Sequence, residues 1–295
     1  MGQAIALNLQ ELGLNLLSAA VYGSLLSLVS FGLTLVFGLG RVVNFAAGVF
    51  YALGAYFALT FLPITGYWFG MAVAPLLVAF IGLLVDQGVI RPIRNRPEIY
   101  TLLVSFAVAI LFTGIIERAW GGHAAKMVDP PILGSFEIFG GPFPQWRVYA
   151  ALIAVIFVGL VWRGLYTTAF GLRIRAASDN RLMASLLGLN TSKALTATFG
   201  LSCGMAALAG ALAGPIFSVR STMGNDLLID AFLAVIVGGL GSLRGAVVGA
   251  YLIAAMKNLP VGWLDAENAS ISTFALVVFV LLARPAGVFG EGRVE

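Results

Sequence analysis

Long apolar runs, separated by short polar stretches, constrain this chain more than any other feature. The first run covers residues 13–38 and is interrupted mainly by Ser and Gly. A helix of that length, rising about 1.5 Å per residue, crosses a hydrocarbon core of about 30 Å. Similar runs cover residues 45–62, 67–90, 99–119, 146–166 and 192–217. Because only 10% of the residues are charged, against about 25% in soluble domains, the chain is predicted to be an integral membrane protein.

The last third of the chain departs from simple spans. The apolar stretch 227–258 is too long for one crossing and is broken by GGLGSLRG. We therefore expect two segments, 227–240 and 245–258, either as two short crossings or as a re-entrant pair. A final span is expected at 270–283. The predicted fold class is an all-α, polytopic transmembrane helical bundle of about eight to nine spans, with a broken or re-entrant Gly-rich segment near 238–245. In the span 192–217, Gly200/Gly204 and Gly210/Gly214 predict tight helix packing.

The basic residues predict the orientation, because cytoplasmic loops carry an excess of Lys and Arg. Twelve of the 17 Lys and Arg residues fall on one side of the predicted spans, and five fall on the other. The larger group is Arg41, Arg91, Arg94, Arg96, Arg163, Arg173, Arg175, Arg181, Lys193, Arg244, Arg284 and Arg293; the smaller is Arg118, Lys126, Arg147, Arg220 and Lys257. The N-terminus is then outside and the C-terminus cytoplasmic. Topology accounts for the pI of 9.4, so no nucleic acid partner is needed.

One long polar and basic interval, residues 171–190, faces the cytoplasm in this topology. Ser178 is expected to cap a helix of about two and a half turns that ends at Gly188. Leu182, Met183, Leu186 and Leu187 share one face at helical spacing, whereas Asp179, Asn180, Arg181 and Ser185 lie elsewhere. This apolar face is expected to enter a groove on another protein. The alternative is a helix on the lipid surface, although the polar face lacks the lysines usual in such helices.

The chain has few of the side chains that usually bind metals or act in catalysis. The chain has one Cys, Cys203 in an apolar run, and one His, His123 in a Gly-rich loop, so no metal site, cofactor or catalytic residue is predicted. Asp86, Glu117 and Asp230 lie near span ends, where hydrated interfacial carboxylates are expected. An ion-driven secondary transporter would usually need an ionisable group deep within a span. A simple channel is compatible with the composition but leaves the 171–190 helix unexplained.

Several segments together resemble the permease subunits of ABC importers for branched-chain amino acids. They are RVVNFAAGVFYALGAY (41–56), RAASDNRLMASLLGLN (175–190), AFLAVIVGGLGSLRGAVVGAY (231–251) and the tail LLARPAGVFG (281–290). They occur in the family's order and extend over most of the chain, so residues 1–295 are expected to form one permease domain with 171–190 as its coupling segment. The chain departs from the family at Ala47-Gly48-Val49, where His-Gly-Glu/Asp is common, and at Arg244, where Pro is common.

The resemblance implies a transport subunit without enzymatic activity of its own. Its partners would be a second, homologous permease, two cytoplasmic ATP-binding subunits, an extracytoplasmic substrate-binding protein and the lipid bilayer of a bacterial-type inner membrane. The coupling residues would be Asp179, Arg181, Leu182, Met183, Leu186, Leu187 and Gly188. An importer of urea or short amides is the alternative within this class.

A second set of small or polar residues is expected to line the translocation pathway. It consists of Asn44, Gly48, Gly239, Gly241 and Ser242. Such groups interrupt otherwise apolar helices, and breaks of this kind are tolerated where they line a cavity or are buried in protein. Close helix packing is the alternative for the glycines.

Overall fold

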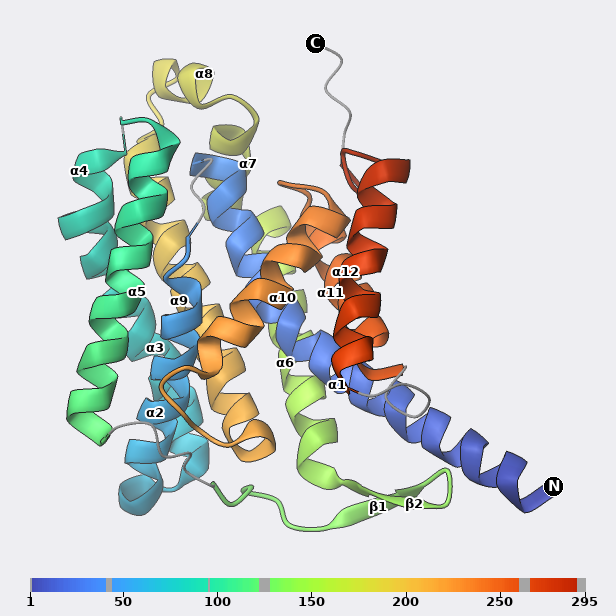
Figure 1. Cartoon of the computed structure of the whole chain (residues 1–295). Helices are drawn as coiled ribbons and strands as arrows, with labels where there is room; N and C mark the ends of the chain where they lie inside the picture. The colour runs from blue at the N-terminus through green and yellow to red at the C-terminus, as the bar shows by residue number, and fades with distance from the viewer. Residues whose placement is uncertain (1, 41–43, 95, 122–127, 260–265, 291–295) are drawn as a thin grey trace.

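A computed structural model describes residues 2–40, 44–94, 96–121, 128–259 and 266–290. Arg41, His123, Lys126 and Arg293 lie outside these residues. The described chain is an all-α bundle with one small hairpin (Figure 1). Its first half contains α1 (Gly2–Gly40), α2 (Ala47–Thr65), α3 (Tyr67–Val85), a π-helical segment (Asp86–Ile90), α4 (Arg91–Ile93), α5 (Glu98–Trp120), β1 (Ser135–Ile138) and β2 (Gly141–Pro144). Its second half contains α6 (Gln145–Thr167), α7 (Ala169–Asp179), α8 (Arg181–Leu186), α9 (Thr191–Phe217), α10 (Met223–Gly238), α11 (Leu243–Asn258) and α12 (Ala266–Ala283).

Six helical segments of the described chain are long and apolar enough to cross a membrane. The most apolar windows of α1 and α9 are each 83% buried, whereas those of α5 and α6 are 22% buried. α1 and α9 therefore form the centre of the bundle, and α5 and α6 lie at its edge. The remaining long sides of the bundle expose large apolar residues, as expected for a surface that faces lipid.

Glycines of α9 bring neighbouring helices into backbone contact. A Cβ atom on Gly200 would lie 2.7 Å from Leu83 of α3, and one on Gly210 would overlap the Tyr51 carbonyl of α2. Cys203 packs in the same way, because a Cβ atom on Gly82 would lie 2.6 Å from its sulfur. The tight packing expected of these small residues is confirmed.

α10 and α11 form an antiparallel hairpin that turns at the expected Gly-rich break. At 16 residues each, they extend about 24 Å, which is shorter than a hydrocarbon core of about 30 Å. The tail after α12 returns to this turn, where the backbone N–H groups of Val288 and Phe289 donate to Val237 and Gly238 at 2.8 and 3.0 Å. These bonds satisfy two carbonyls at the end of α10 that have no helical partner.

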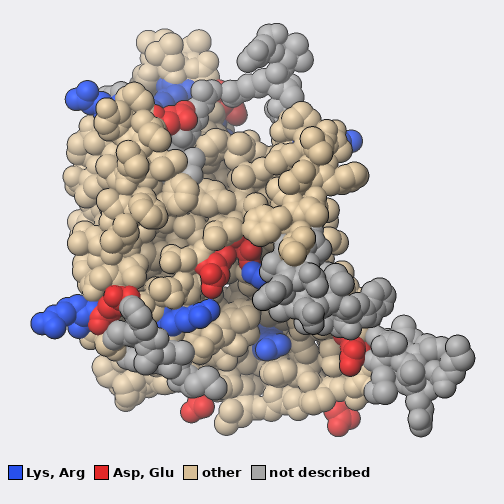
Figure 2. Space-filling view, viewed as in Figure 1, with Lys and Arg blue, Asp and Glu red and all other residues tan. Residues whose placement is uncertain are grey.

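The two ends of the bundle contain different elements. α7 and α8 extend from one end, together with α4 and the end of α12; the N-terminus of α1 and the β1–β2 hairpin lie at the other (Figure 1). In the surface view, Lys, Arg, Asp and Glu gather at the α8 end and in a lower belt, with a largely uncharged band between them (Figure 2). This distribution fits a protein that spans a membrane.

Candidate functional site

α8 presents the four apolar residues of the predicted docking face to solvent. Leu182, Met183, Leu186 and Leu187 are 71%, 54%, 72% and 76% exposed, and we call them the α8 face. Ala184, on the other side of α8, is buried. Leu189 packs against the core, and its backbone N–H donates to the Ala184 carbonyl at 3.0 Å. α8 is thus fixed to the bundle by its inner side while its apolar outer side has no partner among the described residues.

The caps of α8 differ from the sequence prediction. Asn180 is the N-cap: its side-chain oxygen accepts from the Met183 N–H at 2.9 Å. Ser178 instead lies within α7 and donates to the Gly38 carbonyl of α1 at 2.9 Å, so the prediction of a Ser178 cap was wrong. The helix is also shorter than expected, with six residues, because the extended backbone of Asn180 separates it from α7. Gly188 ends it as predicted, with a φ of 81° that favours glycine.

Two polar residues of the 171–190 segment are also exposed to solvent. Asp179 and Arg181 are exposed on either side of the Asn180 cap. α7 joins this segment to the spans through Arg175, whose Nε donates to the Leu165 carbonyl at 3.1 Å and whose guanidinium lies 4.6 Å from the Tyr166 ring centroid. The start of α7 is capped by Thr168, which accepts from the Gly171 N–H at 3.1 Å. The segment is therefore held against the ends of both α1 and α6.

Asn44 and Gly48 lie inside the bundle at the start of α2. Asn44 is 1% exposed; its side-chain oxygen accepts from the Ala46 N–H at 3.0 Å, while its Nδ2 is buried without a hydrogen-bond partner in the described structure. A Cβ atom on Gly48 would lie 2.6 Å from the Gly224 carbonyl of α10. Gly48 therefore allows α2 and α10 to approach closely, so its small size serves helix packing.

Gly239, Gly241 and Ser242 form the turn between α10 and α11. Gly239 has a φ of 107°, and a Cβ atom there would lie 2.5 Å from the Gly290 backbone nitrogen. Gly241 also has a positive φ, but no neighbour lies close to it. Ser242 caps α11 by accepting from the Gly245 N–H at 3.1 Å. This turn lies at the end of α10, whereas Gly48 packs against Gly224 near the start of that helix, so the structure does not bring the five pathway residues together.

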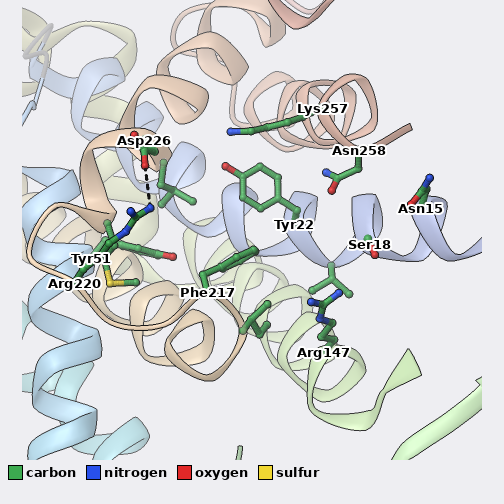
Figure 3. A pocket seen from close by; sticks show the side chains of 14 residues that line it. Asn15, Ser18, Tyr22, Tyr51, Arg147, Phe217, Arg220, Asp226, Lys257 and Asn258 are labelled. Atoms are coloured by element: carbon green, nitrogen blue, oxygen red, sulfur yellow. Dashed lines mark hydrogen bonds and ion pairs between the residues drawn. The ribbon is translucent and has the colours of Figure 1, made fainter. Parts of the chain in front are cut away.

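A cavity of about 400 Å³ opens at the opposite end of the bundle, between α1, α6, α9, α10 and α11 (Figure 3). It contains none of the five predicted pathway residues, although Met223, which precedes Gly224, lines it. Apolar groups such as Val21, Phe217 and Leu227 form part of its wall, and uncharged polar groups and charged groups form the rest. Arg147, Arg220 and Lys257 come from three different helices or loops. Sequence reasoning had assigned all three cations to the same side of the membrane but had not joined them in one site.

Two buried carboxylates correct the expectation of hydrated side chains. Asp86 is 0% exposed and accepts from Arg94 and from Thr196 of α9, each at 2.5 Å. Asp230 is 7% exposed; it accepts from Tyr22 of α1 and, at 2.5 Å, from Lys257 of α11. A charge inside a membrane protein is expensive unless it is paired. Both expectations were wrong because proximity to a span end says nothing about which neighbouring helix covers the side chain.

Glu117 is the third of these carboxylates and is only half-buried; it accepts from Ser221 at 3.0 Å. Among the described residues, no group of three His, Cys, Asp or Glu side chains is placed to hold a metal ion.

The bundle and its apolar flanks define a class, the polytopic α-helical membrane proteins. A family model described as "Branched-chain amino acid transport system / permease component" matches residues 15–283. The chain therefore belongs to this permease family, as the resemblance had indicated, and it is a transport subunit that spans the membrane several times.

Individual relatives are similar to the chain over nearly its whole length. The high-affinity branched-chain amino acid transport system permease protein LivH of Salmonella typhimurium is 28% identical over 92% of this chain and 94% of that protein. BraD of Pseudomonas aeruginosa, a permease protein of the same description, is 27% identical over 95% and 96%. LivM of Escherichia coli, also a permease protein of such a system, is 26% identical over 90% of this chain and 68% of its own length.

Proposed function

We propose that this chain is a translocating permease subunit of an ATP-driven importer for branched-chain or related amino acids. The observation that carries the proposal is the α8 face: four large apolar side chains, all more than half exposed, on a short helix that is capped and anchored from behind. Water does not favour such a surface, since burying each of these side chains is worth about 1.5–3 kcal/mol. A groove on a cytoplasmic ATP-binding subunit is the partner that covers it.

The position of α8 suits the transmission of a movement. Ser178 bonds α7 to the end of α1, and Arg175 bonds it to the end of α6. A displacement of α8 by closure of two ATP-binding subunits would therefore be passed directly to a central and a peripheral span. In the proposed cycle this movement switches the spans between outward-facing and inward-facing states, and ATP hydrolysis is left to the partners.

The proposed assembly contains a second permease, two ATP-binding subunits and an extracytoplasmic substrate-binding protein. The existence of both LivH and LivM relatives supports two similar permeases side by side. In this assembly the α8 end is cytoplasmic. Arg94 bonds Ser192 at the start of α9, and Arg244 lies 5.9 Å from the Trp162 ring near the end of α6, so basic residues gather at the α8 end as the positive-inside rule requires.

A secondary transporter is the competing class, and the buried carboxylates Asp86 and Asp230 alone would suit it as well. Family membership and the α8 face favour the importer. The test is affinity purification of the tagged chain from its native membranes in mild detergent. We expect two ATP-binding subunits and a second permease of the same family to co-elute. Elution of the chain with copies of itself only would contradict the proposal.

A further inference from the structure

Two arginines lie against a stacked pair of aromatic rings near the α8 end of the bundle. The rings of Trp162 and Tyr166, one turn apart on α6, are stacked with their centroids 5.4 Å apart. The guanidinium carbon of Arg175, on α7, lies 4.6 Å from the Tyr166 centroid, and that of Arg244, on α11, lies 5.9 Å from the Trp162 centroid. Each ring thus attracts one cation. We call these four residues the aromatic–arginine cluster.

Neither guanidinium of this cluster has a counter-charge in the described part of the chain. The ion pairs among the described residues are all made by other cations. Arg175 donates from its Nε to the Leu165 carbonyl at 3.1 Å, so its terminal nitrogens point away from that bond and remain available as donors. A guanidinium offers a planar fork of donors that matches two oxygens of one anion. The cluster is therefore suited to a phosphate or a carboxylate.

The cluster lies where α6 leaves the apolar part of the bundle. Its two rings belong to the last two turns of α6. Leu152, Ile156 and Leu160, one turn apart on the same helix, are 52%, 60% and 60% exposed, so an apolar flank of α6 runs through the lipid toward this end. Trp and Tyr concentrate at the boundary between membrane and water, which is also the level of the lipid headgroups.

The surroundings of the cluster favour a lipid over a soluble anion. The crevice beside Arg175, between α1, α7 and the α10–α11 turn, holds about 50 Å³, whereas sites for small molecules hold about 300–1,000 Å³. Only a small group can enter it, and the rest of the ligand must lie outside the bundle. A carboxylate of an ATP-binding subunit is less suitable, because α8 lies farther from the spans than the end of α6 (Figure 1).

We propose that the aromatic–arginine cluster binds the phosphate headgroup of an anionic phospholipid in the leaflet next to α8, with the acyl chains along the exposed flank of α6. Basic sites between spans attract anionic headgroups in this way. The bound lipid would join α6, α7 and α11 at the point where α7 connects the 171–190 segment to the spans. The inference requires only that the chain spans the membrane, and it does not depend on coupling through α8.

The test measures which lipid lies against Trp162. The full chain is reconstituted in phosphatidylcholine vesicles with added phosphatidylglycerol, and one of the two lipids carries bromine, which quenches tryptophan fluorescence on contact. The Trp162 signal is the difference between each protein and its own Trp162→Phe version. We expect Trp162 of the wild type to select phosphatidylglycerol. An arginine near an anionic headgroup contributes about fivefold, so Arg244→Gln should reduce this preference about fivefold, whereas Arg244→Lys keeps the charge and should retain most of it.

Arg96→Gln is the matched control. Arg96 lies between α4 and α5 and is also exposed, but it contacts neither ring of the cluster. Its replacement removes one charge from the same end of the bundle and should leave the lipid preference at Trp162 unchanged. A purely structural role of Arg244 would lower the thermal stability of Arg244→Gln without altering its lipid preference.

Three results would overturn the inference. The first is an equal preference of wild-type Trp162 for the two lipids, or a wild-type preference in Arg244→Gln. The second is displacement of phosphatidylglycerol by millimolar glycerol phosphate, which would show that the cluster takes a soluble phosphate. The third is loss of the ATP-binding subunits from Arg244→Gln with an unchanged lipid preference, which would show that the arginines face a protein carboxylate.

Discussion

Leu186→Asp should separate folding of this permease from its coupling to ATP hydrolysis. Leu186 is 72% exposed, so docking of α8 can remove most of its side chain from water, a gain of about 1–2 kcal/mol out of the 1.5–3 kcal/mol for full burial. The aspartate loses this gain and adds the cost of burying a carboxylate, which is several kcal/mol without a partner. A combined loss of at least about 4 kcal/mol corresponds to a several-hundredfold weaker contact.

The assay is retention of ATP-binding subunits during detergent purification, together with substrate-stimulated ATP hydrolysis. The Leu186→Asp variant should insert at the wild-type level, because none of the spans depends on the α8 face, yet it should lose its ATP-binding subunits. Ser185→Asp places the same charge on the same helix but off this face and should be nearly normal. Asn180→Asp keeps a capping oxygen and should also be mild. A Leu186→Asp complex that purifies intact and hydrolyses ATP normally would refute the coupling role.

Three further predictions follow from burial and topology. A cysteine introduced by Asn180→Cys should resist an impermeant thiol reagent added to intact cells, whereas one introduced by Gly134→Cys, at the other end of the bundle, should react. Labelling of the Asn180→Cys variant would show that the α8 end faces the outside of the cell. Asn44→Leu removes a buried nitrogen without a hydrogen-bond partner, but it also removes the oxygen that accepts from the buried Ala46 N–H, so the free energy of unfolding should fall by about 1–3 kcal/mol while uptake falls; unchanged uptake would leave Asn44 outside the pathway. Asp86→Leu leaves the buried Arg94 charge unpaired and should lower the free energy of unfolding by about 3–5 kcal/mol. Breaking the exposed Arg220–Asp226 pair through Asp226→Asn should lower it by less than about 1 kcal/mol. Similar losses in the two variants would show that burial does not determine how much an ion pair contributes to stability.

Sequence hydropathy predicted the long helices well because their apolar runs are about as long as a bilayer core is thick. The expected runs 99–119 and 192–217 became α5 (Glu98–Trp120) and α9 (Thr191–Phe217), and the Gly-rich break near 238–245 became the α10–α11 turn. The π-helical segment Asp86–Ile90 had no such signal. It contains the Asp86 carboxylate, which Arg94 and Thr196 hold from outside the segment, and hydropathy does not report tertiary contacts of this kind.

The candidate sites, too, were predictable where local sequence determines them and not where tertiary contacts do. The α8 face was predictable from four apolar residues at helical spacing in a polar segment, but its cap was not, since Ser178 and Asn180 both suit that role. In the structure the Ser178 hydroxyl donates to the Gly38 carbonyl instead of capping α8. The cavity at the end opposite α8 was missed altogether. Arg147 and Asp226 are 79 positions apart in the sequence, and only the packing of α6 and α10 against α1 brings them to one cavity.

Uptake of labelled leucine, isoleucine and valine by proteoliposomes containing the co-purified complex distinguishes an ATP-driven importer from a secondary transporter. We predict uptake only when ATP is present on the side of the α8 face and the substrate-binding protein is on the other side. Under those conditions, imposed proton or sodium gradients should have no effect. Uptake that proceeds without ATP, or that follows an ion gradient, would contradict the account and identify the chain as a secondary transporter.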